Sequence, residues 1–215
     1  NTGSLPVTFT PTAALPLYAR SASDIRDHRH VTSLLHRIRT TETGLEVKPS
    51  FSFDERGHKI NHVTYGAYGA EADGTGPVGF FPEVEEYIGE GGTCDWPDAV
   101  VRNLPTLAQA GESFEGFEAI GAMRFADTTL VPGASKRWVV ALAVSEEGND
   151  TSVLSRPYLS SASFDEQLAM CKAAWREKLG TIGFGSADEG FDRWMKWVSL
   201  QPILRRIYGC SFLPH

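Results

Sequence analysis

Short runs rich in β-branched and aromatic residues alternate with turn-forming clusters over the first 160 residues. The runs lie at 5–10, 31–38, 45–48, 59–65, 119–125, 137–144 and 151–155. Clusters of Gly, Pro, Asn and Asp separate many of them, for example at 54–57, 73–77, 132–133 and 147–150. Many short strands separated by such turns predict antiparallel sheets stacked as a β-sandwich. We therefore expect a mainly β domain over residues 1–160.

Two amphipathic helices are predicted after residue 160. Apolar side chains recur there at steps of three and four, which places them on one helical face: Phe164, Leu168, Cys171, Trp175 and Leu179. A second stripe follows at Phe191, Trp194, Met195 and Val198. A Ser-x-x-Glu capping box precedes each stripe, and Pro202 is expected to kink the second helix. Residues 161–215 are thus predicted to be a helical linker and the start of the next domain, with apolar stripes that need a partner.

The stretch 71–117 is rich in glycine, acidic and aromatic residues, and it predicts a long ordered loop. Its centre gathers carboxylates, which accept hydrogen bonds from sugar hydroxyls, beside rings that can stack on a sugar. The candidate substrate-binding residues are Glu86, Tyr87, Glu90 and Trp96. Two other interpretations remain open. The loop could be a solvated acidic surface whose aromatic residues pack on the sheet, or its carboxylates could be a glycosidase acid and base.

Titratable residues are densest at 27–30, with His36 beyond them. In a strand, His28 and His30 would share a face and could bind a transition metal with help from Asp27. A structural network of ion pairs fits the same residues, as do contacts with a sugar or a neighbouring domain. We assign neither a metal site nor a catalytic residue from this pattern.

The composition, charge and motifs of the sequence disfavour several classes of function. The 215 residues include 27 acidic and 20 basic side chains, for a net charge of −7, which disfavours a nucleic-acid partner. No apolar run approaches the ~20 residues of a membrane span. Three cysteines without CxxC spacing fit reduced thiols and a cytoplasmic location. The sequence lacks the GxSxG, GxxxxGK[ST] and HExxH motifs, so no cofactor is predicted.

Four segments in consistent order resemble glycoside hydrolase family 94, most closely its 1,2-β-oligoglucan phosphorylases. They lie at 18–37, 53–61, 87–99 and 191–209. The resemblance implies a supersandwich-type β-sandwich, two linker helices and an (α/α)6 barrel. It also implies cleavage of β-glucosides by inverting attack of inorganic phosphate, giving α-glucose 1-phosphate without a metal. The general acid and the phosphate-binding residues of the family belong to the barrel, which we expect to lie beyond His215.

The resemblance predicts that this chain is the non-catalytic N-terminal part of such a phosphorylase and is inactive alone. Its implied partners are a β-glucan oligosaccharide, its own barrel domain and a second copy in a homodimer. Tyr87 to Trp96 correspond to a sandwich loop that approaches the active site in relatives. The alternatives are a stand-alone carbohydrate-binding module and an assembly domain without a ligand. Because both ends look cut, we also expect exposed apolar edges on the sheets.

Overall fold

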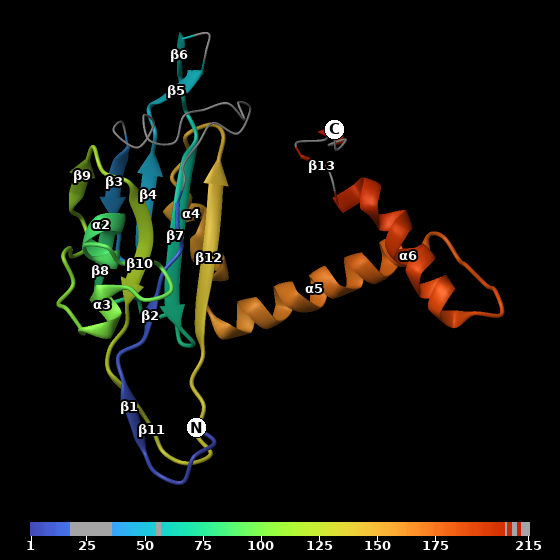
Figure 1. Cartoon of the computed structure of the whole chain (residues 1–215), viewed down its shortest axis with the longest axis horizontal. Coiled ribbons are helices and arrows are strands. Elements are labelled where there is room, and N and C mark those ends of the chain that lie inside the picture. The colour runs from blue at the N-terminus through green and yellow to red at the C-terminus, as the bar shows by residue number, and fades with distance from the viewer. Residues whose placement is uncertain (18–35, 55–56, 205, 208–209, 212–215) are drawn as a thin grey trace. The chain divides into compact units, whose positions relative to one another are not determined.

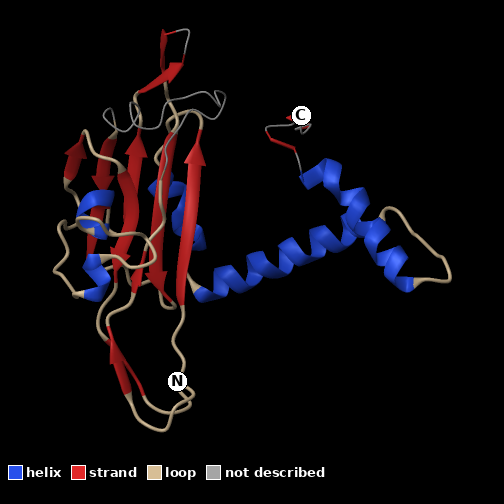
Figure 2. Cartoon of the chain, viewed as in Figure 1, coloured by secondary structure: helices blue, strands red, loops and turns tan. Residues whose placement is uncertain are grey.

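The computed structural model describes residues 1–17, 36–54, 57–204, 206–207 and 210–211 (Figure 1). Contacts divide the chain into two compact units, Asn1–Phe164 and Asp165–His215. The fold is mixed, with slightly more strand than helix: antiparallel sheets are followed by C-terminal helices (Figure 2). The prediction of antiparallel sheets and C-terminal helices is therefore confirmed, whereas the mainly β description overstates the strand content.

The larger sheet of the first unit has five antiparallel strands. In spatial order they are β12 (Trp138–Ser145), β7 (Thr64–Glu71), β4 (Gly44–Lys48), β3 (Arg37–Thr40) and β9 (Ser113–Glu115). Side chains of β3 alternate between the two faces, with Ile38 buried and Arg37 and Arg39 exposed. This alternation directs Ile38 into the core and the two arginines to the opposite face of the sheet.

A smaller antiparallel sheet contributes to the same core. Its strands, in order, are β2 (Thr12–Ala13), β10 (Ala119–Arg124) and β8 (Gly79–Glu83). Met123 and Phe80 from this sheet share one buried cluster with Ile38 and Val47 from the larger sheet. At Gly121 a Cβ atom would lie 2.4 Å from the Cβ of Ala67, so the close approach of β10 to β7 requires glycine.

Three two-stranded ladders complete the strands. They are β1 (Val7–Phe9) with β11 (Thr128–Leu130), β5 (Phe51–Asp54) with β6 (Gly57–Ile60), and β13 (Arg206–Ile207) with β14 (Cys210–Ser211). The strand expected at 31–38 falls partly outside the described residues, and its described part begins β3 at Arg37.

Two sequence predictions in the first unit are wrong. The run 151–155 is not a strand but the helix α4 (Thr151–Ser155), followed by the 3-10 turn η2 (Arg156–Tyr158). The carboxylate of Asp150 accepts hydrogen bonds from the backbone nitrogens of Ser152 and Val153, and this N-cap outweighs the strand preference of the run. The stretch 71–117 is not one loop, because it contains β8, α2 (Val84–Ile88), α3 (Asp98–Val101) and β9.

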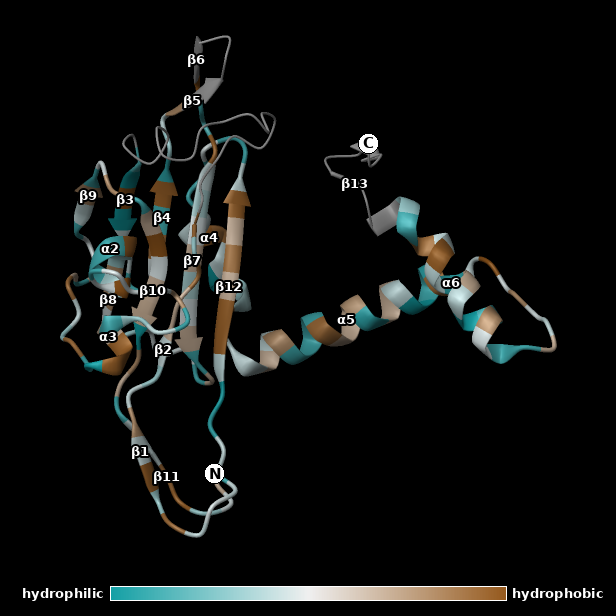
Figure 3. Cartoon of the chain, in the orientation of Figure 1, coloured by the Kyte–Doolittle hydropathy of each residue, from teal (hydrophilic) through white to brown (hydrophobic). Residues whose placement is uncertain are grey.

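The predicted helices are present as α5 (Ser161–Gly180) and α6 (Glu189–Leu204), with Pro202 inside α6. Apolar positions recur along both helices (Figure 3). Many of these side chains are exposed, among them Trp194 and Trp197. None of the described helices combines the length and apolar character required to cross a membrane.

Candidate functional site

The acidic segment, residues 83–98, folds against the smaller sheet. Tyr87 of α2 is buried and meets Phe81 of β8 edge to face, with 5.8 Å between ring centroids. Ala99 of α3 joins the same cluster, together with Ile120 and Ala122 of β10. Burial raises the pKa of the Tyr87 hydroxyl above its ordinary value. The segment is therefore anchored by apolar packing.

Arg124 fixes α3 to β10. Its guanidinium donates to the carbonyl of Ala99 at 2.7 Å and to the carbonyl of Leu104. It also lies over the ring of Phe81, 5.0 Å from the centroid. Burial lowers the pKa of Arg124 from its ordinary value, although it remains a cation at neutral pH. The buried guanidinium of Arg124 thus contacts two carbonyl oxygens and the ring of Phe81, under the acidic segment.

A hollow of ≈ 520 Å³ lies on the outer side of the acidic segment. Glu85, Glu86, Glu90 and Asp98 line it, with glycines 89 and 91 between them. Both glycines have positive φ, of 77° and 70°, which lets the chain turn sharply around the hollow. The hollow therefore offers several carboxylate oxygens as hydrogen-bond acceptors.

Of the four predicted site residues, Glu86 and Glu90 line this hollow together. Trp96 does not line it; its side chain is 71% exposed in the turn before α3. Tyr87 is buried beneath the segment, so its ring has no free face for a sugar to stack on. Trp96 is therefore the one of these four residues that could still provide an aromatic platform.

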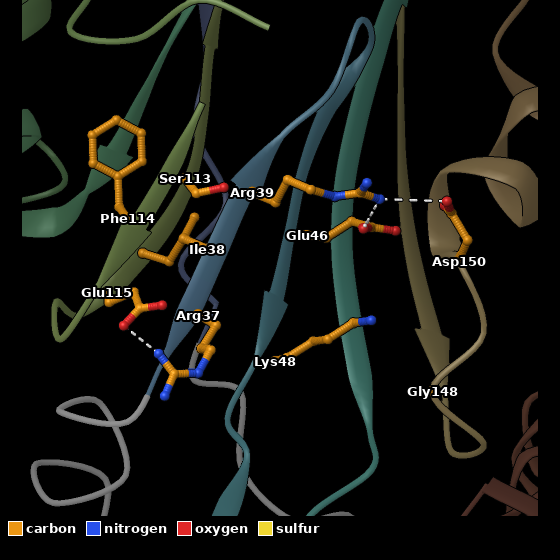
Figure 4. Close-up of a pocket in the computed structure, with 10 residues that line it drawn as sticks. All are labelled: Arg37, Ile38, Arg39, Glu46, Lys48, Ser113, Phe114, Glu115, Gly148 and Asp150. Atoms are coloured by element: carbon orange, nitrogen blue, oxygen red, sulfur yellow. Dashed lines mark hydrogen bonds and ion pairs between the residues drawn. The ribbon is translucent and has the colours of Figure 1, made fainter. Parts of the chain in front are cut away.

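A second hollow, of ≈ 530 Å³, lies on the polar face of the larger sheet (Figure 4). Charged residues of both signs line it: Arg37, Arg39, Glu46, Lys48, Glu115 and Asp150. We did not predict these residues as a group. The available signal was the period-two alternation of 37–40 and 45–48, which places the charged residues opposite the core.

Glu46 is the centre of this second hollow and is only 2% exposed. Its Oε2 accepts a hydrogen bond from Arg39 Nη2 at 2.7 Å (Figure 4). Its Oε1 lies 3.2 Å from the Tyr68 hydroxyl, 3.1 Å from the Thr151 hydroxyl and 3.2 Å from the backbone nitrogen of Ser152. The carboxylate thereby ties α4 to β4 and β7, which is a structural role.

The surroundings of Glu46 shift the pKa values of three neighbouring groups. The hydrogen bond from Arg39 to Glu46, and the attraction between them, raise the pKa of Arg39 above its ordinary value. Hydrogen bonds from Ser152 hold the pKa of Asp150 well below its usual range. Burial raises the pKa of the Tyr68 hydroxyl. Arg37 pairs with Glu115 nearby, whereas Lys48 has no ion-pair partner among the described residues.

The histidine cluster at 27–30 lies outside the described residues. His36 is described, and it is buried at 2% exposure. Within the described part of the chain, no three His, Cys, Asp or Glu side chains gather closely enough to hold a metal ion. Cys94 and Cys171 are free and exposed thiols.

No protein-family model matches the chain, and no curated protein matches it.

Proposed function

We propose that the chain is the non-catalytic N-terminal part of a β-glucan phosphorylase of the family-94 type. In this proposal the first unit is a supersandwich-type β-sandwich, and α5 and α6 are the linker to an (α/α)6 barrel. Support comes from the four resembling sequence segments and from two antiparallel sheets that share one core. We also propose a cytoplasmic location, for which the cysteine pattern is the support.

The observation that carries the proposal is the anchored acidic segment. Glu86 and Glu90 line a hollow of glucose size or larger, and the exposed Trp96 belongs to the same segment. Carboxylates accept hydrogen bonds from sugar hydroxyls, and an indole can cover the apolar face of a glucose ring. Because packing of Tyr87 and the hydrogen bond from Arg124 to Ala99 anchor the segment on the smaller sheet, the backbone that carries the acids is ordered before a ligand arrives.

The acids are proposed to bind the glucan and not the phosphate. The hollow is lined by Glu85, Glu86, Glu90 and Asp98 and by no basic side chain, so a phosphate ion would be repelled. Phosphate attack and general-acid catalysis are assigned to the barrel, and the segment contributes binding energy and orientation.

The C-terminal helices are proposed to pack against that barrel. Trp175, Leu179, Trp197 and Leu200 line a hollow of ≈ 470 Å³ between α5 and α6 whose exposed surface is almost wholly apolar. An apolar helical surface of this kind is stabilised by a covering partner. This surface therefore supports the linker assignment.

An assay of the isolated chain tests whether it is non-catalytic. The chain is incubated with β-1,2-glucooligosaccharides and inorganic phosphate, and glucose 1-phosphate is measured by a coupled enzyme assay. We expect no release above a heat-denatured control. Sustained release would contradict the proposal, because it would require a general acid within these 215 residues.

Calorimetric titration with the same oligosaccharides separates the alternatives. The proposal predicts no saturable binding by the isolated chain, because the glucan would be held mainly by the barrel. Saturable binding that Trp96→Ala abolishes would instead support a stand-alone carbohydrate-binding module.

A further inference from the structure

The second hollow, on the polar face of the larger sheet, is lined by three cations and three anions: Arg37, Arg39, Lys48, Glu46, Glu115 and Asp150. Its volume of ≈ 530 Å³ falls within the range of small-molecule sites, about 300–1,000 Å³. Some of these charges are engaged by protein partners and others are not. The charges that keep unused hydrogen-bonding capacity determine the chemistry of a ligand.

Strand pairing places two of the cations opposite each other. Arg37 of β3 pairs with Lys48 of β4 in the antiparallel register. Like charges directly opposite each other in a sheet are destabilising. Figure 4 shows the two side chains leaning apart, Arg37 toward Glu115 and Lys48 toward the side of the hollow where Asp150 lies. Because Lys48 has no ion-pair partner among the described residues, its ammonium keeps its donors for a ligand.

Asp150 is the acid with unused acceptor capacity. Its Oδ1 accepts hydrogen bonds from the backbone nitrogens of Ser152 at 2.9 Å and Val153 at 3.4 Å, which fix the carboxylate. Its Oδ2 lies 3.4 Å from Arg39 Nη2, a long contact that leaves room for a second donor. The hydrogen bond from the Ser152 hydroxyl holds the pKa of Asp150 well below its usual range, so the carboxylate stays ionised.

The remaining acids of the hollow are already engaged. Glu46 is buried, and both of its oxygens accept hydrogen bonds from protein donors. Glu115 forms an ion pair with Arg37. The opposite charges with unused capacity are therefore Lys48 and Asp150, which line the same hollow but form no ion pair with each other.

Charge is distributed unevenly over the hollow. At one end the opposed Arg37 and Lys48 meet the single carboxylate of Glu115, so the field there favours an anion. At the other end two carboxylates share the single guanidinium of Arg39, so the field there favours a cation. A ligand with only one sign of charge would be repelled at one end, whereas a ligand that carries both signs is attracted at each.

We propose that the second hollow binds a small zwitterion of the amino-acid class. The ammonium of Lys48 donates to the carboxylate of the ligand, and Oδ2 of Asp150 accepts from its ammonium. The two ends lie two residues apart along β3, or about 7 Å, which a small zwitterion with a hydrogen bond on either side spans. The flexible stem of Lys48 lets its ammonium follow the carboxylate.

Calorimetric titration of the 215-residue chain with glycine, L-serine and L-glutamine tests the proposal. At least one of these zwitterions should bind saturably in the millimolar range. The N-acetyl derivative of that amino acid keeps only the carboxylate, and the amide derivative keeps only the ammonium. Each derivative should bind at least tenfold more weakly, because one of the two charged hydrogen bonds is lost.

Two variants each remove one of the proposed partners. Lys48→Met and Asp150→Asn should each weaken binding roughly tenfold to a hundredfold. Asn retains the N-cap of α4, and Lys48 is exposed without an ion-pair partner in the described part of the chain, so both variants should stay folded by circular dichroism. Lys172→Met and Asp95→Asn, matched changes at exposed residues outside the hollow, should bind as the wild type does.

NMR titration locates the bound amino acid. Backbone amide resonances of 46–48 and 148–150 should shift, whereas those of the acidic segment should not. The proposal is overturned if none of the three amino acids binds saturably, or if the N-acetyl derivative binds as tightly as the zwitterion, which would indicate a plain anion site. Wild-type affinity in either Lys48→Met or Asp150→Asn also overturns it. The inference does not depend on the proposed glucan function.

Discussion

Replacing Arg39 should destabilise the first unit more than neutralising its partner Glu46. Arg39→Met leaves the carboxylate of Glu46, which is 2% exposed, without its cation. Breaking a buried ion pair from one side costs about 3–5 kcal/mol. The side chain of Arg39 is 53% exposed and three uncharged donors remain on Glu46, so we expect a loss near the lower limit, about 3 kcal/mol.

Glu46→Gln should cost less, about 1–2 kcal/mol. The glutamine keeps the side-chain volume and an acceptor oxygen, and the half-exposed guanidinium of Arg39 can be solvated by water. The double variant should then be no less stable than Arg39→Met alone, because no buried charge is left unpaired.

The assay is chemical denaturation followed by tryptophan fluorescence, with thermal unfolding alongside. A loss of 3 kcal/mol in a domain of this size lowers the thermal midpoint by about 6–12 °C. Strictly additive losses in the double variant would refute the reasoning, as would a larger loss for Glu46→Gln than for Arg39→Met.

Three further predictions concern single positions. Asp150→Asn keeps the N-cap of α4 but removes the charge beside Arg39. Because folding lowers the pKa of Asp150, the stabilising effect of its charge is present above about pH 4 and is lost as the pH falls further. The unfolding free energies of the wild type and the variant should therefore converge in acid. Arg124→Met should speed amide hydrogen exchange in the acidic segment at least tenfold relative to the larger sheet. The reason is that the Ala99 carbonyl of α3 loses a charged donor worth about 1.5–3 kcal/mol; uniform acceleration would contradict this. Gly89→Ala should lower the thermal midpoint by several degrees, because φ is 77° and the new Cβ would lie 2.6 Å from Asp98 Oδ2, whereas Gly185→Ala, in open space, should not.

Local patterns hold information on the faces of the sheet that our sequence predictions did not use. Alternation in 37–40 and 45–48 separates core residues from the charged residues of the second hollow. Helical periodicity after residue 160 likewise identified α5 and α6, because a repeat of three to four residues persists over several turns.

Other elements depend on partners that are distant in sequence. Pro82 and Gly79 weaken the strand pattern of β8 in the sequence. Proline is tolerated there because β8 is an edge strand of the smaller sheet. Thr151 is helical partly because Glu46, 105 positions earlier, binds its hydroxyl. The burial of Tyr87 depends on contacts with Phe81 and β10, which the composition of the segment does not show. The prediction that Tyr87 stacks on a sugar could therefore not take this burial into account.

The central claim, that the acidic segment contacts a β-glucan, is tested most directly by steady-state phosphorolysis in the longer protein that the proposal implies. Glu90→Ala and Trp96→Ala are compared with Glu147→Ala, an exposed acid outside the segment. Losing one charged hydrogen bond to a sugar costs about 1.5–3 kcal/mol, so Glu90→Ala should raise the oligosaccharide KM roughly tenfold to a hundredfold without lowering the thermal midpoint. Trp96→Ala should act in the same direction, and Glu147→Ala should have no effect. Unchanged KM and kcat in both segment variants would contradict the claim.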